Sequence, residues 1–238
     1  MIKKIAKKII NRLFPKPLPF TQTYAQGGED ILIAMGLKMA NITHPTYLDI
    51  GTNHPISLNN TYLLYEKGAS GVCVEPNPVF NNLIKKHRPK DMILNLGVGK
   101  VSGETLDFYV LIPDVLSTFD AKEVEELSQQ GHVAVKEIIK VPILSINDII
   151  EKHCVQLPDI VSIDVEGWNQ DIVESFDFTR CRPSVFCIET ITFTMDSTGA
   201  KITPIINRMI QNDYWILGET HINTIFIDGR VVKQRILE

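Results

Sequence analysis

Short apolar runs alternate along the chain with segments in which apolar residues recur at a helical spacing. The runs that predict strands cover residues 46–50, 71–76, 92–99, 159–167 and 183–190, and residues 138–153 predict a strand that leads into a helix. Helical spacing covers residues 28–40, 57–67, 80–87 and a segment near 201–212, with Ser57 or Asn60 as the expected cap of the second helix. Strands that are apolar on both faces need cover on both faces, so the pattern predicts an α/β fold with a parallel sheet between two layers of helices.

Two later strand patterns depart from this alternation. Residues 214–219 and 223–230 follow one another without a helical pattern between them, which predicts an antiparallel hairpin at one edge of the sheet. Residues 104–111 can add an extra strand, and the polar segment 120–137 is predicted to be a helical or mobile insertion. No internal repeat or linker divides the chain, so residues 21–238 are predicted to form one domain.

The N-terminal segment has a different character. Apolar residues recur at near-helical spacing over residues 1–16 with lysines opposite, and Pro15 ends the pattern, which predicts a basic amphipathic helix within residues 1–20. The helix is too short and too charged to span a bilayer, and it lacks the apolar core of a signal peptide. Two interpretations stay open: attachment to an anionic membrane surface, or a packed or mobile terminal helix with solvated lysines.

Charge and cysteine content indicate which partners and which cellular compartment to expect. The whole chain has a net charge of −4 and residues 1–16 carry +6, so the remainder carries −10. An acidic body disfavours nucleic acid as a partner, because neutralising phosphates requires a basic face. The four cysteines show no metal-like spacing, and two of them lie inside apolar runs. Reduced core cysteines predict a cytoplasmic protein, and the basic helix allows contact with the inner face of the cell membrane.

The turn after the first predicted strand follows only part of the dinucleotide-binding pattern G-x-G-x-x-G. Asp49 and Gly51 end the strand "YLDIG", but the next two glycine positions hold Asn53 and Ile56. A pyrophosphate needs many backbone N–H donors, whereas a sulfonium nucleoside does not, so the missing glycines favour S-adenosylmethionine over a dinucleotide. Glu75 ends the second predicted strand, where a carboxylate can accept hydrogen bonds from both ribose hydroxyls of a nucleoside.

Several segments together resemble a known family. They are "YLDIGTNHPISLNNTYLLYEKGASGVCVEPNP", "DIVSIDVEGWNQDI" and "PSVFCIET", with "YAQGGEDIL" upstream and "NTIFIDG" downstream. Over about residues 22–230 the chain resembles the FkbM family of S-adenosylmethionine-dependent methyltransferases. The resemblance implies a class I methyltransferase fold, which is a Rossmann-like, doubly wound and mostly parallel seven-stranded sheet with an antiparallel edge hairpin. It also implies methyl transfer to a hydroxyl oxygen.

The resemblance further implies which residues surround the cofactor. Asp49, Gly51 and Asn53 would lie near its methionine part, Glu75 would bind the ribose, and Asn77, Asn95, Leu96 and Gly97 would border the adenine. Thr52 stands where the family often has alanine, a small change that leaves the turn plausible.

Methyl transfer to a hydroxyl requires alignment of the acceptor and removal of a proton. Asp164, Glu166, Glu189 and His54 are the candidate catalytic residues, because each follows a predicted strand. One of the carboxylates could act as the base, or Asp164 and Glu189 could hold Mg²⁺ and lower the pKa of the hydroxyl. The alternatives are structural: Asp164 capping the next helix, Glu166 in solvent, and His54 bonded within its own loop before Pro55.

The expected acceptor is a sugar in a glycan or surface polysaccharide, or in its precursor, as the resemblance implies. Two other functions stay open. One is a methyltransferase that acts on a natural product or on nitrogen. The other is a non-catalytic cofactor-binding scaffold at the membrane, which the acidic residues after the fourth and fifth main strands disfavour. Acceptor contacts are predicted from residues 112–137 and from the loops after those two strands.

Overall fold

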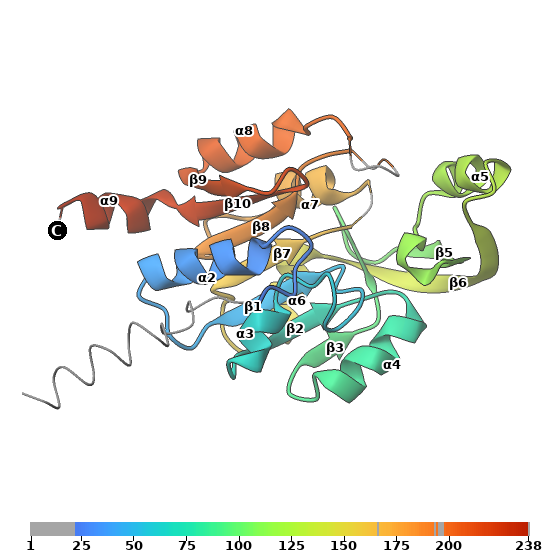
Figure 1. Cartoon of the computed structure of the whole chain (residues 1–238), viewed down its shortest axis with the longest axis horizontal. Coiled ribbons are helices and arrows are strands. Elements are labelled where there is room, and N and C mark those ends of the chain that lie inside the picture. Colours follow the sequence, from blue (N-terminus) through green and yellow to red (C-terminus); the bar gives the residue numbers. More distant parts are fainter. Residues whose placement is uncertain (1–21, 166, 193, 195–197, 238) are drawn as a thin grey trace, which may run out of the picture.

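The computed structural model describes residues 22–165, 167–192, 194 and 198–237. A seven-stranded sheet in the order β3-β2-β1-β7-β8-β10-β9 forms its centre (Figure 1). The strands are β1 (Thr46–Ile50), β2 (Ser70–Val74), β3 (Met92–Leu94), β7 (Ile160–Ile163), β8 (Val185–Glu189), β9 (Tyr214–Glu219) and β10 (Asn223–Asp228). β10 is antiparallel to both of its neighbours, and the pairings among β1, β2, β3, β7 and β8 are parallel. The predicted sheet and its antiparallel edge hairpin are confirmed.

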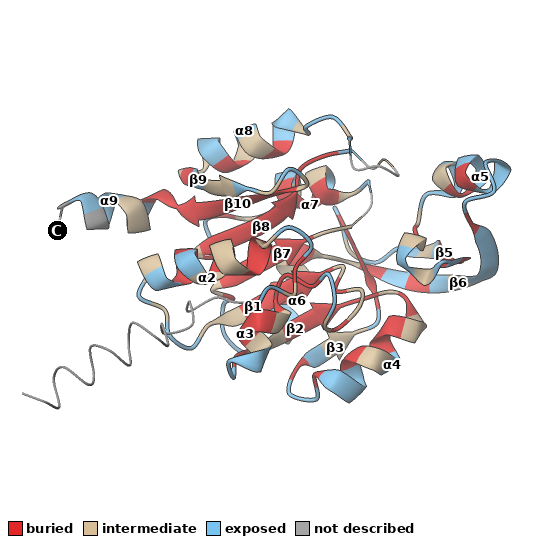
Figure 2. Cartoon of the chain, viewed as in Figure 1, coloured by how far each residue is buried: buried red, intermediate tan, exposed pale blue. Residues whose placement is uncertain are grey.

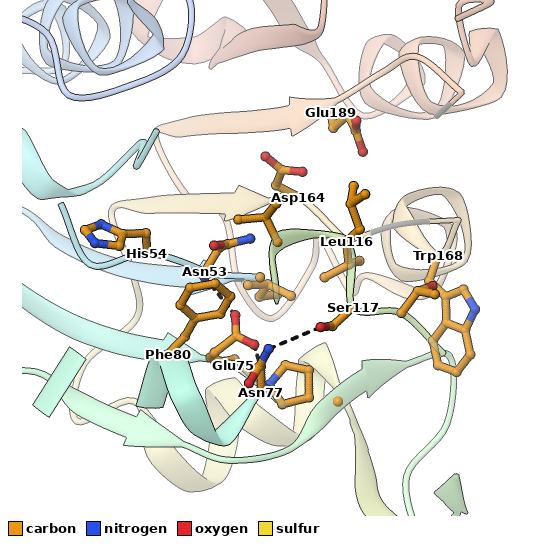
Figure 3. Close-up of a pocket in the computed structure, with 18 of the residues that line it drawn as sticks. Asn53, His54, Glu75, Asn77, Phe80, Leu116, Ser117, Asp164, Trp168 and Glu189 are labelled. Carbon is orange, nitrogen blue, oxygen red and sulfur yellow. Dashed lines mark hydrogen bonds between the residues drawn. The ribbon is translucent and has the colours of Figure 1, made fainter. Parts of the chain in front are cut away.

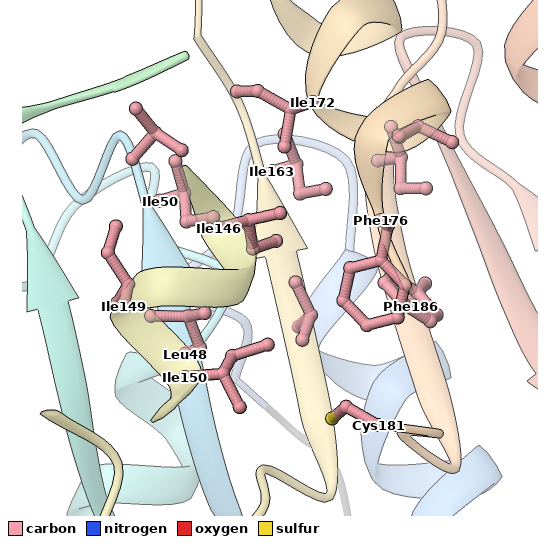
Figure 4. Close-up of a cluster of buried hydrophobic side chains, with 14 of the residues drawn as sticks. Leu48, Ile50, Ile146, Ile149, Ile150, Ile163, Ile172, Phe176, Cys181 and Phe186 are labelled. Atoms are coloured by element: carbon pink, nitrogen blue, oxygen red, sulfur yellow. The ribbon is translucent and has the colours of Figure 1, made fainter. Parts of the chain in front are cut away.

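Helices cover both faces of this sheet. The helices are α2 (Glu29–Met39), α3 (Tyr62–Glu66), α4 (Pro78–His87), α6 (Ile146–His153), α7 (Asn169–Ser175), α8 (Thr203–Gln211) and α9 (Gly229–Leu237). Side chains of α6, α7 and α8 pack with Leu48, Ile50 and Phe186 in one apolar cluster, part of which Figure 4 shows. Side chains of α2, α3 and α4 pack with Tyr47 and Cys73 in a second cluster. Alternate residues of β1 therefore enter opposite layers, as expected for a doubly wound fold.

A smaller sheet extends from the main one. Its strands, in the order β4-β6-β5, are β4 (Gly97–Gly99), β5 (Thr105–Ile112) and β6 (Ala134–Ser145). The turn η1 (Asp114–Leu116) and helix α5 (Ala121–Gln129) connect β5 to β6. Together they form an arm beyond the main sheet, and much of α5 and the first half of β6 is exposed (Figures 1 and 2).

The structure corrects several predicted elements. The predicted strand 92–99 is two strands, β3 and β4, which belong to different sheets because β4 pairs with β6. The predicted helix 57–67 begins only at Tyr62, and Asn59, rather than Ser57 or Asn60, accepts hydrogen bonds from backbone N–H groups at its start. Residues 120–137 form α5 and the start of β6. Helix α9 was not predicted, because residues 229 and 230 were assigned to the last strand and residues 231–237 to no element.

The N-terminal segment of the chain precedes the described residues. The predicted amphipathic helix of residues 1–20 lies outside the described residues, so its contact with a membrane surface stays a prediction. Among the helices of the described part of the chain, none is long and apolar enough to cross a bilayer.

A fully buried arginine connects the first strand to the segments around it. The Arg88 guanidinium lies 2.7 Å from Asp91 and 3.7 Å from Asp49. It also donates hydrogen bonds to the side chains of Asn59 at 3.1 Å and Thr61 at 2.9 Å. A buried charge is tolerated only when its donors are satisfied, and here four side chains satisfy them. Arg88 therefore joins β1, the loop before α3, and the turn before β3.

We predict that Arg88→Met lowers the free energy of unfolding by about 3–5 kcal/mol, because it leaves two buried carboxylates without their cation. Urea titration followed by circular dichroism measures this change. Arg180→Met is the matched control, since Arg180 forms an exposed ion pair with Glu151 at 3.3 Å and should cost no more than about 1 kcal/mol. Similar losses in both variants would show that the buried network does not stabilise the fold.

Candidate functional site

A cavity of about 490 Å³ lies at the carboxyl ends of β1, β2, β7 and β8 (Figure 3). The sheet order reverses between β1 and β7, which is where open α/β sheets bind their ligands. The volume is within the usual range for small-molecule sites. The arm closes one side, because residues 114–119 line the cavity, whereas α5 contributes no lining residue among those described.

Gly51 begins the turn that follows β1. Its φ of 77° lies in the left-handed region, and a Cβ atom here would be 1.9 Å from the carbonyl oxygen of Asp164. Asp164 in turn donates its backbone N–H to the Ile50 carbonyl at 3.0 Å. Glycine is therefore required where the ends of β1 and β7 meet. The sequence pattern did not indicate this close packing of the two strand ends as the reason for the glycine.

The next residues of the turn are fixed by hydrogen bonds. Asn53 has φ 53°, a left-handed conformation that asparagine tolerates better than most residues. The Asn59 side chain donates hydrogen bonds to the backbone carbonyls of the two residues that flank Asn53, Thr52 at 3.0 Å and His54 at 3.2 Å. Because the Asn59 side-chain oxygen accepts a bond from Arg88, the buried arginine orients the residue that holds this turn.

The turn presents its backbone to Glu75, which follows β2. The N–H groups of Asn53 and Asn77 each donate to one oxygen of the buried Glu75 carboxylate at 2.7 Å. Each oxygen has a further lone pair, and Glu75 lines the cavity. Burial raises the pKa of Glu75 to about 7, although the two N–H donors partly oppose this shift. The carboxylate is thus held rigidly with acceptor capacity left for a ligand.

Of the four residues predicted to border an adenine, three line the cavity and one does not. Asn77, Leu96 and Gly97 line the cavity. Asn77 caps α4 through Val79 N–H and donates to Ser117 on the arm at 3.2 Å. Asn95 is exposed and is not among the described lining residues; its side chain bonds the carbonyls of Glu75 and Pro76. Asn95 therefore supports the loop after β2 from outside.

Asp49 lies behind the cavity. It is buried, accepts a hydrogen bond from the Thr61 hydroxyl at 2.6 Å and pairs with Arg88. Burial raises the pKa of Asp49, and the Arg88 charge opposes the shift. Asp49 is not among the described residues that line the cavity, so the structure gives it a supporting position beneath the turn. Its predicted proximity to the methionine part of a cofactor stays a prediction.

Two carboxylates face the cavity from β7 and β8. Asp164 and Glu189 both line it, and Glu189 is buried. The Asn169 side chain donates to Glu189 at 2.8 Å and accepts from Val165 N–H at 2.9 Å, so it fixes the acid against the neighbouring strand end. Burial raises the pKa of Asp164 to about 6, and the negative charges of Asp49 and Glu29 add to the shift. Glu166 lies outside the described residues.

His54 lines the cavity, but its ring is engaged in the loop. Its Nδ1 accepts hydrogen bonds from the backbone N–H groups of Ile56 at 3.2 Å and Ser57 at 3.0 Å. An accepting Nδ1 assigns the ring proton to Nε2, so the imidazole has no unoccupied basic nitrogen. Burial lowers the pKa of His54, and Figure 3 shows its ring directed away from Asp164 and Glu189. This geometry favours the structural alternative for His54.

Aromatic and apolar side chains complete the cavity wall, and most of them were not predicted from the sequence. Phe119 stacks on Trp168 with ring centroids 5.2 Å apart, and Phe80 and Leu116 add further apolar surface. The position of Trp168 directly after "DVEG" was an available signal. Phe119 lies within residues 112–137, which were predicted to contact an acceptor, but its position against Gly97 depends on tertiary structure and was not predicted.

The structure also bears on the predicted metal site. Among the described residues, no group of three or more histidine, cysteine, aspartate or glutamate side chains is arranged to hold a metal ion. The proposal that Asp164 and Glu189 bind Mg²⁺ therefore gains no support from the side chains that the structure places.

Comparison with models of protein families identifies the family of this chain. The methyltransferase FkbM domain matches residues 49–214. A search of curated proteins found no match. One similar solved structure is a TehB-like SAM-dependent methyltransferase from Corynebacterium glutamicum, with 10% identity, TM-score 0.40 and coverage of 95% of this chain and 97% of that one. Another is precorrin-6y C5,15-methyltransferase from Geobacter metallireducens, with 12% identity, TM-score 0.38 and coverage of 85% and 80%. Both scores are too low for either structure to inform the site.

We predict that Gly51→Ala costs at least about 2 kcal/mol of unfolding free energy, from left-handed strain and from the clash with the Asp164 carbonyl. Gly68→Ala is the matched control, because Gly68 also has positive φ (98°) but a Cβ there would meet nothing within 4 Å. Thermal and urea unfolding give both values. Equal losses would mean that the contact between the two strand ends does not require glycine.

Proposed function

The chain belongs to the FkbM methyltransferase family, and on this premise we propose that it binds S-adenosylmethionine in the cavity and methylates a sugar hydroxyl. The observation that carries the proposal is the buried Glu75 carboxylate, which two backbone N–H groups hold at the cavity wall. A carboxylate fixed in this way can accept hydrogen bonds from both hydroxyls of a ribose.

The charge of the wall supports a sulfonium cofactor. Glu75, Asp164 and Glu189 line the cavity, and the described lining residues include no lysine or arginine. A cationic sulfonium is attracted to such a wall, whereas a pyrophosphate would be repelled and would meet few N–H donors. The turn at Gly51 and Asn53 would receive the methionine part, and Asn77, Leu96 and Gly97 would surround the adenine.

Asp164 is the residue that we propose as the base. Methyl transfer displaces the thioether from the methyl carbon while the acceptor oxygen forms the new C–O bond and loses its proton. A base works best when its pKa lies near the working pH, and the pKa of Asp164 is about 6. Glu189, held by Asn169, would accept a hydrogen bond from a neighbouring hydroxyl and orient the sugar. S-adenosylmethionine would supply the activated methyl group; the protein supplies position and proton removal.

The composition of the acceptor side supports a sugar. Carboxylates accept hydrogen bonds from hydroxyls, and the apolar side chains of Val165, Ile191 and Ile222 can contact the C–H faces of a ring. The hydroxyl of Thr194 is buried without a hydrogen-bond partner in the described part of the chain, so it can bond a ligand there. A sugar unit of a glycan or of its precursor has this mixture of hydroxyl and C–H surface.

We predict that Glu75→Ala weakens S-adenosylmethionine binding at least about 100-fold, because two hydrogen bonds to a charged acceptor are lost. Isothermal titration calorimetry measures the affinity, and circular dichroism checks that the variant is folded. Glu104→Ala, an exposed acid on the arm side, is the control and should bind as the wild type does. An affinity for Glu75→Ala within about threefold of the wild type would remove the ribose assignment.

We also predict that Asp164→Asn lowers the methyl-transfer rate by about 100-fold or more while S-adenosylmethionine affinity changes less than tenfold. In the wild type, the rate should rise as the pH increases through about 6, because only the deprotonated acid can accept a proton. Transfer of a labelled methyl group to a panel of methyl hexopyranosides provides the assay.

The exposed Asp107 provides the control for this experiment, since Asp107→Asn removes one acid that is not among the described lining residues. Its rate and pH profile should match those of the wild type. An Asp164→Asn variant that retains the wild-type rate would show that another group takes the proton.

A further inference from the structure

The acids of the cavity lie on both sides of the point where the sheet order reverses. Glu75 follows β2, on the side assigned to the ribose, whereas Asp164 and Glu189 follow β7 and β8. Figure 3 shows Asp164 between the other two carboxylates. Asp114, at the start of η1, adds a fourth acid to the lining. The space beside β7 and β8 is therefore the acceptor side, and it has carboxylates of its own.

The described cations near this wall are each paired with a carboxylate. Arg88 lies behind the turn and pairs with Asp91 at 2.7 Å. Lys136 lies 3.9 Å from Asp114, and Lys201 lies 2.9 Å from Glu219. These three residues are not among the described lining residues, which include His54 but neither lysine nor arginine. No described cation of the wall is thus placed to bind an anionic group of an acceptor.

The other residues described on the acceptor side carry no positive charge. Ile191, Ile222 and Val165 are apolar, and Thr194 is neutral. The negative charges of Asp49 and Glu29 contribute to the raised pKa of Asp164, although Asp49 itself pairs with Arg88. A phosphate, sulfate or carboxylate that entered here would lose its water and face like charges.

Resting on the proposed function, we propose that the acceptor side selects by charge. The sugar unit that enters is neutral or carries an amino group, and units that carry phosphate, sulfate or carboxylate are excluded. Asp164 and Glu189 are the residues that determine this selection: one takes the proton, the other orients the ring, and both repel an anionic substituent. Any anionic part of a larger acceptor must then lie outside the cavity.

The test uses the full chain saturated with S-adenosylhomocysteine, whose own binding is measured first by calorimetry. Matched sets of methyl glycosides in the gluco, galacto and manno series then serve as probes, each as the neutral sugar, the 2-amino sugar, the uronate and the 6-phosphate. Saturation-transfer NMR and competition titrations rank their affinities. We expect a neutral or amino member to bind and its uronate and phosphate counterparts to bind at least about tenfold more weakly.

A double variant, Asp164→Asn with Glu189→Gln, keeps the shapes of both side chains and removes their charges. It should reduce the discrimination against anionic members to less than about threefold, whereas Asp107→Asn should leave it unchanged. The proposal is overturned if an anionic sugar binds as tightly as its neutral counterpart, if the double variant discriminates as the wild type does, or if no neutral or amino sugar binds. Failure to bind S-adenosylhomocysteine would instead contradict the proposed function itself.

Discussion

The site depends on the hydrogen bonds and ion pairs that the buried Arg88 guanidinium forms. It satisfies Asp49 and Asp91 behind β1 and orients the Asn59 side chain, which holds the carbonyls on either side of Asn53. The turn then presents the Asn53 N–H to Glu75 at 2.7 Å. A contact with no access to the cavity therefore determines the position of the carboxylate that faces a ligand. Residues that never touch the cofactor can be as necessary to binding as those that do.

The distribution of charge follows from the same arrangement. Arg88 is placed behind the turn, where it neutralises Asp49, and the described residues that line the cavity include neither lysine nor arginine. Burial without a cation raises the pKa of Glu75 to about 7 and that of Asp164 to about 6. A cationic ligand relieves this uncompensated charge, and one carboxylate with a pKa near neutrality can act as a base. In the proposed function, cofactor preference, proton removal and acceptor selection would thus share one physical origin.

The sequence predicted features that local patterns determine. Apolar runs gave the main sheet, and the rule that ligands bind at the carboxyl ends of parallel strands brought Glu75, Asp164 and Glu189 to one cavity. Features set by tertiary neighbours were not accessible. The split of residues 92–99 into two strands depends on the pairing of β4 with β6. For His54 the sequence left two alternatives open, and the structure favours the one in which its ring bonds to its own loop.

In the proposed complex, Glu75 binds the ribose of S-adenosylmethionine and the sulfur lies toward Asp164. A crystal structure of the protein with S-adenosylhomocysteine would show both positions. We expect both ribose hydroxyls within hydrogen-bond distance of the Glu75 carboxylate, with the Asn53 and Asn77 N–H bonds intact. A nucleoside bound elsewhere, or a Glu75 side chain turned away from the ribose, would contradict this expectation.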